Sequence, residues 1–321
     1  LEGLDPTREL RALGRLGGSL LVPGGRGWPE MLDDLGEAAP ICLWVRGPAE
    51  IVQSLGDRLV GAVSVVGTRA CTAYGESVTA RLVEEAVGWG AAVVSGGAFG
   101  VDATAHRAAL AAGGLTVAVM AGGVDRLYPA GNDRLLKAVA ASGAVISEVP
   151  PGGAPRRERF LTRNRLIAAL GAVTVVTEAG WRSGSHRTAH DAAALLRPVA
   201  AVPGPVTAAA SAGCHKLIRD GVATLVTGAD EVRELLAPLG QVELMDHDAV
   251  GGPLDGLGPA DRQVFDSLPK VRGAALTAVV VASGLGTHDV MAALGRLERA
   301  GRVCQSGGLW RPAKAASYLE A

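Results

Sequence analysis

The 321-residue sequence has few cysteines, few aromatic residues and no nucleotide-hydrolysis signature. Its four cysteines stand far apart without a CxxC pair, which argues against zinc ribbons and against a disulfide scaffold. With only five Trp, three Tyr and three Phe, a surface built mainly from base-stacking rings is not expected. No glycine-rich loop ends in Gly-Lys-Ser or Gly-Lys-Thr, so nucleotide hydrolysis by a P-loop is excluded.

Long apolar runs are also lacking. The longest nearly uncharged run, Gly273 to Gly286, is shorter than the ~18 residues that span a bilayer, and no secretory signal opens the chain. An apolar fraction of 48% with 20% charged residues excludes general disorder. We therefore expect a soluble, reduced, cytoplasmic protein of about two domains, at roughly 150 residues per domain.

Basic charge is not in excess, because 31 Lys and Arg face 32 Asp and Glu for a net charge of −1. A nucleic-acid site would therefore be a local patch. Only four of the basic residues are lysines, so the available phosphate ligands are mostly forked guanidinium groups. A GC-rich genome would explain the same bias.

From Arg58 to about Leu239, short runs rich in Val and Ala alternate with helix-length segments. Several runs are apolar without alternation, as in strands covered on both faces. Strands are expected at Leu59–Val66, Ala91–Ser95, Thr116–Met120, Ala144–Ser147, Ala172–Thr177, Val199–Val202 and Ala223–Val226. This repetition predicts an α/β fold with a doubly wound, mostly parallel sheet over residues 51–239.

The two flanking regions have other patterns. Residues 1–50 predict an irregular or partly helical lead-in, and residues 240–258 mix acids and glycines as a linker does. Residues 259–321 predict a winged-helix domain, because three helix candidates precede a possible hairpin. These elements are Ala260–Leu268, Ala274–Ser283, Thr287–Ala300 with Thr287 as N-cap, and the strands Arg302–Cys304 and Gly308–Trp310.

In doubly wound sheets, ligands bind beyond the carboxyl ends of the strands. The first predicted strand, Leu59–Val66, is followed by Gly67 and Arg69. Gly67 would let the backbone come close to an anion, and Arg69 could bind a phosphate with two hydrogen bonds. The second predicted strand leads into Ser95-Gly96-Gly97, whose glycine amides would seat a phosphate at a helix N-terminus. A tight strand-to-helix turn that needs positive φ explains the same glycines.

Ser95, Asp102 and His106 lie close enough in sequence for a Ser-His-Asp triad to be conceivable. No nucleophile elbow accompanies them, and capping or core roles explain them better. We therefore expect no catalytic residues and no enzyme activity.

An arginine cluster covers residues 156–165, where five arginines and one glutamate give a local charge of +4. It contains Phe160, Arg163, Asn164 and Arg165. Arginines with an interleaved ring suit the phosphates and bases of a nucleic-acid strand. A solvated loop is the alternative.

A further helix start is predicted at Ser183-Gly184-Ser185, which offers hydroxyl and amide groups to an anion. His186 and His190 follow at the i, i+4 spacing of metal ligands. Arg187 stands where a zincin helix would carry Glu, so we expect no metal site.

Taken in order over roughly residues 58–230, these segments resemble the DprA (Smf) family of DNA-processing proteins. The resemblance is carried by Val66-Gly67-Thr68-Arg69, Val94-Ser95-Gly96, Arg163-Asn164-Arg165 and Ser183-Gly184-Ser185, among others. It implies an extended Rossmann-like core with a C-terminal winged helix. The family's N-terminal SAM-like domain would be truncated or absent here.

The resemblance also implies a function: a cytosolic single-stranded-DNA binder that protects incoming DNA and loads RecA onto it during natural transformation and recombination. It implies a homodimer and no cofactor. The implied DNA-binding residues are Gly67, Arg69, Ser95, Gly96, Gly97, Phe160, Arg163, Asn164, Arg165, Ser183, Gly184, Ser185 and Lys216. Leu161, Cys214-His215 and His186 depart from the family's usual residues.

Two other functions remain open on the sequence. LOG-type nucleotide phosphoribohydrolases share a similar fold, but their PGGxGTxxE signature is not matched by the segment from Glu178 to His186. The second alternative is a transcription regulator whose sheet domain senses a ligand and whose winged helix binds DNA. Its third helix would carry Arg296, Glu298 and Arg299, which is little charge for reading a duplex.

Overall fold

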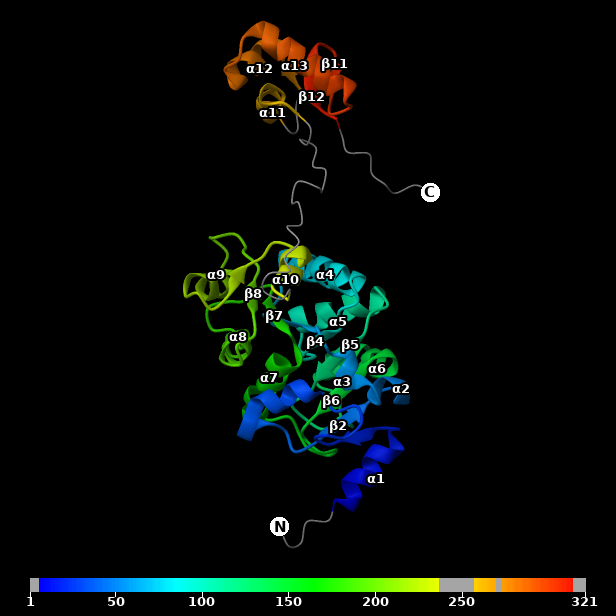
Figure 1. Cartoon of the computed structure of the whole chain (residues 1–321). Helices are drawn as coiled ribbons and strands as arrows, with labels where there is room; N and C mark the ends of the chain where they lie inside the picture. Colours follow the sequence, from blue (N-terminus) through cyan, green and yellow to red (C-terminus); the bar gives the residue numbers. More distant parts are fainter. Residues whose placement is uncertain (1–5, 237–256, 270–272, 314–321) are drawn as a thin grey trace. The chain divides into compact units, whose positions relative to one another are not determined.

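The computed structural model describes residues 6–236, 257–269 and 273–313 (Figure 1). The chain divides into two compact units, residues 1–241 and 242–321.

The first unit is built on one nine-stranded sheet of order β1-β2-β6-β5-β4-β3-β7-β8-β9. The seven strands β3 to β9 are parallel, whereas β1 pairs antiparallel with β2 and β2 antiparallel with β6. The strands are β1 Ser19–Leu21, β2 Leu43–Arg46, β3 Val63–Val66, β4 Val93–Ser95, β5 Thr116–Val119, β6 Ala144–Ser147, β7 Val173–Val176, β8 Val199–Ala201 and β9 Thr224–Leu225. The predicted mostly parallel α/β sheet is confirmed.

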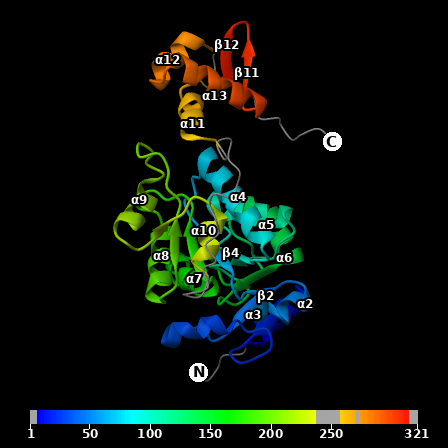
Figure 2. The same cartoon turned by 45° about the horizontal axis from the view of Figure 1, so that its top comes forward.

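Helices cover both faces of this sheet, as the apolar strands require. Val63 and Val65 of β3 pack in a core with α4, α5 and α10, while Val66 packs in a second core with α7 and α8. Figures 1 and 2 show α4 and α5 on one side and α7 and α8 on the other. The helical segments are α1 Thr7–Arg15, η1 Glu30–Ala38, α2 Ala49–Val52, α3 Leu55–Arg58, α4 Ala73–Gly88, α5 Val101–Ala111, η2 Ala130–Asn132, α6 Asp133–Ser142, α7 Arg157–Leu170, α8 Ser185–Ala194, α9 Ala212–Arg219 and α10 Ala229–Glu234.

The N-terminal region differs from its prediction. Residues 1–50 were expected to precede the sheet domain, yet β1 and β2 extend the sheet itself, and Leu43 and Val45 are fully buried in the same core as Ile146 of β6. The boundary at residue 51 is therefore wrong. Three- and four-residue strands carry little periodic signal, and their pairing with β6 is set by contacts about 100 residues away in sequence.

The second unit contains three helices and a three-stranded antiparallel sheet of order β10-β12-β11. Its elements are α11 Pro259–Asp266, β10 Ala274–Ala275, α12 Leu276–Ser283, α13 Thr287–Arg299, β11 Val303–Ser306 and β12 Leu309–Pro312. The three helices and the hairpin fall close to their predicted positions. Ala274–Ala275 forms a strand instead of opening the second helix, and Gly286 rather than Thr287 is the N-cap of α13.

Parts of two predicted segments lie outside the described residues: all but the last two residues of the predicted linker 240–258, and residues 270–272 and 314–321 of the predicted winged helix. Within the described part of the chain, no single helix is long and apolar enough to cross a membrane. Only α12 and α13 taken together, across a bend of 107°, reach that length and composition.

Candidate functional site

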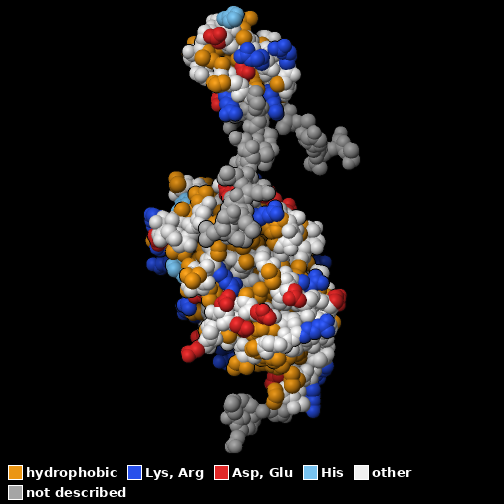
Figure 3. All heavy atoms as spheres, viewed as in Figure 1, with side chains coloured by type: hydrophobic (Ala, Val, Ile, Leu, Met, Phe, Trp, Pro, Cys, Tyr) orange, Lys and Arg blue, Asp and Glu red, His pale blue; other side chains and the backbone are white. Residues whose placement is uncertain are grey.

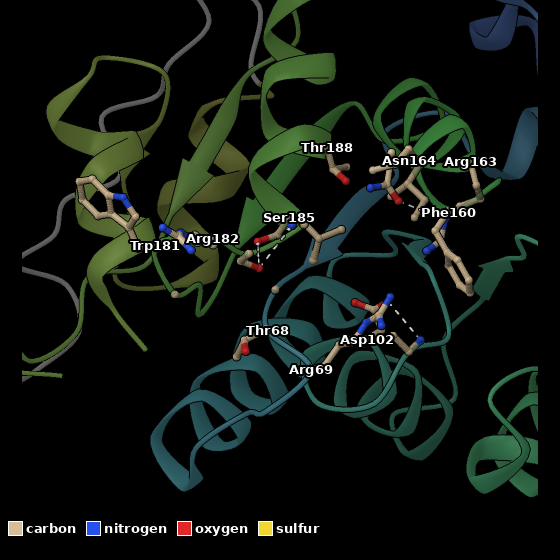
Figure 4. Close-up of a pocket in the computed structure, with 18 residues that line it drawn as sticks. Thr68, Arg69, Asp102, Phe160, Arg163, Asn164, Trp181, Arg182, Ser185 and Thr188 are labelled. Atoms are coloured by element: carbon tan, nitrogen blue, oxygen red, sulfur yellow. Dashed lines mark hydrogen bonds between the residues drawn. The ribbon is translucent and has the colours of Figure 1, made fainter. Parts of the chain in front are cut away.

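The strand order reverses between β3 and β7, which are parallel neighbours with helices leaving toward opposite faces. Such a switch point leaves a crevice beyond the carboxyl ends of the two strands. A cavity of about 480 Å³ lies there (Figure 4). Its lining comes from the β3–α4 loop, the start of α5, one face of α7 and the β7–α8 segment: Val66, Gly67, Thr68, Arg69, Ala98, Asp102, Phe160, Leu161, Arg163, Asn164, Ile167, Gly180, Trp181, Arg182, Ser183, Gly184, Ser185 and Thr188.

The β3–α4 loop brings Arg69 to this cavity. A Cβ on Gly67 would lie 2.6 Å from the carbonyl oxygen of Glu178, so the close approach of the two loops requires glycine there. The Arg69 guanidinium is exposed and lies 5.5 Å from the centre of the Phe160 ring. It makes no hydrogen bond or ion pair with any described residue. Arg69 is therefore free to bind an anion.

Glu178 fixes both ends of the Arg69 loop. Its backbone carbonyl accepts a hydrogen bond from the Thr68 amide at 2.7 Å. Its carboxylate, which is almost fully buried, accepts from the Thr72 amide at 2.8 Å and from the Thr72 hydroxyl at 2.6 Å. The carboxylate lies at the N-terminus of α4, where a negative charge is favourable. On the sequence, Glu178 was named only as the start of a segment compared with the phosphoribohydrolase signature, and this role was missed.

Arg163 was predicted to bind phosphate, but its guanidinium is buried inside the protein. Its side chain is only 6% exposed, and its Nη1 donates hydrogen bonds to the carbonyls of Gly96, at 2.8 Å, and Val119. Burial lowers the pKa of Arg163 to about 10, although the nearby carboxylate of Asp102 raises it. Arg163 lines the cavity as an internal brace that joins α7 to the ends of β4 and β5.

The predicted phosphate seat at Gly96-Gly97 is occupied largely by the protein's own side chains. A Cβ on Gly96 would lie 2.3 Å from Nη1 of Arg163 and 2.7 Å from Oδ2 of Asp102. The Asp102 carboxylate accepts a hydrogen bond from the Ala98 amide at 3.2 Å, and burial raises its pKa. Gly97 has a φ of 81°, which favours glycine, and it does not line the cavity of about 480 Å³. The alternative explanation, a tight turn, therefore fits these glycines better.

The conceivable catalytic triad does not assemble. The hydroxyl of Ser95 is buried and donates to the Val65 carbonyl at 2.7 Å. His106 is also buried, and its Nδ1 pairs with the Thr116 hydroxyl at 2.7 Å. Burial lowers the pKa of His106 to about 3. Ser95 and His106 therefore serve the core, and Ser95 is not exposed to a ligand.

Arg165 points away from the cavity. Its Nε donates to the Ala38 carbonyl at 2.8 Å and its Nη2 to the Glu148 carboxylate at 2.6 Å. These contacts tie α7 to η1 and to the end of β6. Nη1 donates to the Thr162 carbonyl at 2.7 Å, so each of the three guanidinium nitrogens already donates a hydrogen bond. This geometry does not support the prediction that Arg165 grips phosphate.

The start of α8 lies in the middle of the cavity, as predicted for Ser183, Gly184 and Ser185 (Figure 4). The two hydroxyls are 2.8 Å apart, and the Ser185 amide reaches the Ser183 hydroxyl at 3.4 Å. Amides and hydroxyls at a helix N-terminus form an anion site. Residues that line the cavity beside them but were not predicted are Thr68, Asp102, Trp181, Arg182 and Thr188.

A second cavity of about 150 Å³ adjoins the first and is lined by three rings. Phe99 and Tyr128 are each 48% exposed, and the Tyr128 and Phe160 rings lie 5.8 Å apart at 56°. Arg69 and Phe160 border both cavities. The three rings come from segments that are far apart in the sequence. The low number of aromatic residues therefore gave no sign that three of them lie together.

Two predicted features lie beside these cavities. Lys216 of α9 is ion-paired with Asp220, and its Nζ lies 5.8 Å from the centre of the Trp181 ring. His186 and His190 do not converge, since each hydrogen-bonds a backbone carbonyl, of Gly180 and of His186 respectively. In the described ranges there is no group of three side chains that could hold a metal ion.

The site thus combines exposed cations, a helix N-terminus and solvent-facing rings at the switch point of a doubly wound sheet. These are the features of a protein that binds a ligand carrying both phosphates and aromatic groups. On the face shown in Figure 3, basic and acidic side chains are interspersed, so the positive charge of the site is local.

Comparison with known proteins identifies the family. The family model of DNA recombination-mediator protein A matches residues 19–237. The putative DNA processing protein DprA of Mycobacterium tuberculosis is 47% identical over 313 residues, which cover 94% of this chain and 79% of the relative. The chain therefore belongs to the DNA recombination-mediator protein A (DprA) family. The match begins at β1, in agreement with the extended sheet.

Two solved structures agree. The crystal structure of DprA from Streptococcus pneumoniae is 34% identical with a TM-score of 0.64, covering 72% of this chain and 77% of that one. DprA from Helicobacter pylori, whose structure concerns its single-stranded DNA binding mode, is 28% identical with a TM-score of 0.59. That match covers 67% of this chain and 93% of the Helicobacter chain.

Proposed function

We propose that this protein binds single-stranded DNA at the cavity between β3 and β7. The observation that carries the proposal is the juxtaposition of Arg69 with Phe160 beside the two serine hydroxyls at the N-terminus of α8. Arg69 and the Ser183 and Ser185 hydroxyls would hold phosphates, while Phe160 and the neighbouring Tyr128 would stack bases. The single-stranded DNA binding of the Helicobacter relative supports this assignment.

A single strand suits this site better than a duplex. Rings that border a cavity of about 150 Å³ can stack only on bases whose faces are free, and duplex bases are already stacked on each other. The site has no long row of exposed cations that would follow a duplex backbone, since Arg163 and Arg165 are engaged internally. We expect little sequence choice, because stacking and phosphate contacts do not read base edges.

The biological role we propose is DNA processing in natural transformation and recombination: protection of the incoming strand and loading of RecA, by a cytoplasmic homodimer without a cofactor. The DNA-processing names of the relatives support it. We also propose a binding rather than a catalytic role, since Ser95 and His106 are engaged in the core. Neither the phosphoribohydrolase nor the regulator alternative is favoured by the relatives.

For the second unit we propose a winged helix, on the basis of its three helices and its β10-β12-β11 sheet. We expect it to contribute little to single-strand affinity, because the exposed cations and rings of the candidate site belong to the first unit. A chain ending near Leu239 should therefore keep most of its affinity.

The test is fluorescence anisotropy with a labelled single strand and with a blunt duplex of the same sequence. We expect tighter binding of the single strand, and weaker binding by Arg69→Ala. Arg11→Ala, which removes an exposed arginine from α1, is the matched control and should leave binding unchanged. Equal or tighter binding of the duplex would refute the proposal, and a parallel assay for cleavage of nucleoside monophosphates tests the enzyme alternative.

A further inference from the structure

Trp181 is an exposed ring at the edge of the cavity that the proposed function has not used. It lies in the β7–α8 segment, two residues before Ser183, and 57% of its surface is exposed. The indole lines the cavity together with Arg182. In Figure 4, Trp181 and Arg182 lie on one side of Ser185, and Phe160 lies on the other. The α8 N-terminus therefore stands between two rings.

Each of these two rings carries a cation. Arg69 lies 5.5 Å from the Phe160 centre, and Lys216 lies 5.8 Å from the Trp181 centre. A cation over a ring holds the ring in place and puts positive charge beside the face on which a base would stack. The same combination thus occurs at both ends of the α8 anion site, although it is built from different segments.

The surface around Trp181 is also basic. Lys216 and Arg219 both contact the carboxylate of Asp220, Arg219 at 3.9 Å, so this group of three keeps one net positive charge. Arg182 is exposed and has no hydrogen-bond or ion-pair partner in the described part of the chain. Two positive charges that acidic neighbours do not cancel therefore lie near Trp181, where a phosphate backbone would leave the cavity.

We propose that Trp181, backed by Lys216, is a second base-stacking platform, and that a bound DNA strand crosses the α8 N-terminus from Phe160 to Trp181. The proposal rests on the function proposed above. Phosphates between the two platforms face Ser183, Gly184 and Ser185, while one base stacks on each ring. The strand must then be long enough to reach both rings, so the contribution of Trp181 depends on the length of the DNA.

The test is the affinity for oligothymidylates of increasing length, measured for Trp181→Ala, Trp181→Phe and Phe160→Ala. For strands of about 12 nucleotides we expect Trp181→Ala to weaken binding about tenfold, in the range of one lost base stack, and Trp181→Phe to restore most of it. For strands of about 3 nucleotides held at Phe160, the Trp181→Ala loss should shrink to about twofold or less. Phe160→Ala should weaken binding at both lengths.

Trp89→Phe is the matched control. Trp89 also has a cation over its ring, with Arg233 at 6.0 Å, but it follows the C-terminus of α4, away from the cavity lining. Stacking on Trp181 should quench tryptophan fluorescence when the long strand is added, and this quenching should be lost in Trp181→Phe but not in Trp89→Phe.

The outcomes separate the two proposals. If Arg69→Ala and Phe160→Ala do not weaken binding, the proposed site is wrong. If they do, but Trp181→Ala binds long strands as wild type does, the second platform is refuted. An equal loss for short and long strands would also refute it, because Trp181 would then act on the cavity itself and not on a more distant part of the strand.

Discussion

Replacing Arg163 and Arg69 separately should distinguish a structural arginine from a ligand-binding one. Arg163→Ala removes the buried donor to the Gly96 and Val119 carbonyls. Leaving each carbonyl unsatisfied costs about 1–3 kcal/mol, and Asp102 loses its nearest compensating charge. We therefore expect a loss of about 3–5 kcal/mol, a large share of the roughly 5–15 kcal/mol that typically stabilises a domain.

Arg69→Ala should show the opposite pattern. The side chain is exposed and makes no hydrogen bond or ion pair with a described residue, so its removal should change stability by less than about 1 kcal/mol. Affinity for single-stranded DNA should fall. The slope of log affinity against log salt should become shallower by about 0.7, the value for one lost phosphate contact on a single strand.

Denaturant unfolding measures the first quantity, and anisotropy titrations at several salt concentrations measure the second. Arg163→Lys should recover only part of the lost stability, because an ammonium group can replace the Nη1 donor but not the Nε donor that reaches Asn164 Oδ1 at 3.2 Å. The reasoning is refuted if Arg163→Ala keeps wild-type stability but loses about 0.7 of the salt slope. Arg163 would then grip phosphate, as the sequence alone suggested.

Two further predictions follow from buried groups. Unfolded His106 takes up a proton as pH falls below 6.5, whereas the folded residue, with a pKa of about 3, does not; the associated stability, about 5 kcal/mol, is fully present above pH 6.5 and is lost as pH falls toward 3. Unfolding curves from pH 7 to pH 4 should show this, and an equally steep decline in His106→Asn would contradict it. Gly96→Ala should destabilise the fold by about 1–3 kcal/mol, because its Cβ would lie 2.3 Å from the Arg163 guanidinium. Gly184→Ala, where nothing lies within 4 Å of the added Cβ, is the control, and equal melting temperatures for the two variants would disprove the close packing.

The central sheet was predictable because its strands carry a strong local signal. Runs such as Val173–Val176 are buried at every position, and a mostly apolar run without alternation that is followed by glycine or polar residues marks a parallel strand. β2 lacks that signal. Leu43–Arg46 is recognisable as a strand only through its pairing with β6, a contact between segments about 100 residues apart in sequence.

The part of the site that could be predicted is the part that lies at the carboxyl ends of the parallel strands. All parallel strands of one sheet end at the same edge, so Arg69 and Ser183–Ser185 were expected at one edge of the sheet. They meet in one cavity because β3 and β7 are neighbours, and the sequence did not predict that strand order. The arginine cluster was misjudged because its residues were not assigned to a helix, whereas α7 begins at Arg157 and contains all of the cluster except Arg156. Within a helix, residues 160, 163, 164 and 167 share one face, and these line the cavity. Arg165 lies outside that face and reaches η1 instead.

The abundance of arginine in this protein has a structural explanation that its composition could not show. Arg163 and Arg197 each bind backbone carbonyls of two other segments, Arg197 reaching Gly171 at 2.9 Å and Met31 at 3.0 Å. Arg165 likewise joins two other segments, through the Ala38 carbonyl and the Glu148 carboxylate. In Arg165 and Arg197 different nitrogens of one guanidinium reach the two segments, which the single ammonium of a lysine cannot do in the same geometry. These arginines hold loops together at the ends of strands. The cations left for a ligand in the cavity are chiefly Arg69 and Arg182, so a nearly neutral chain can offer a polyanion a small, strongly positioned site without a basic surface.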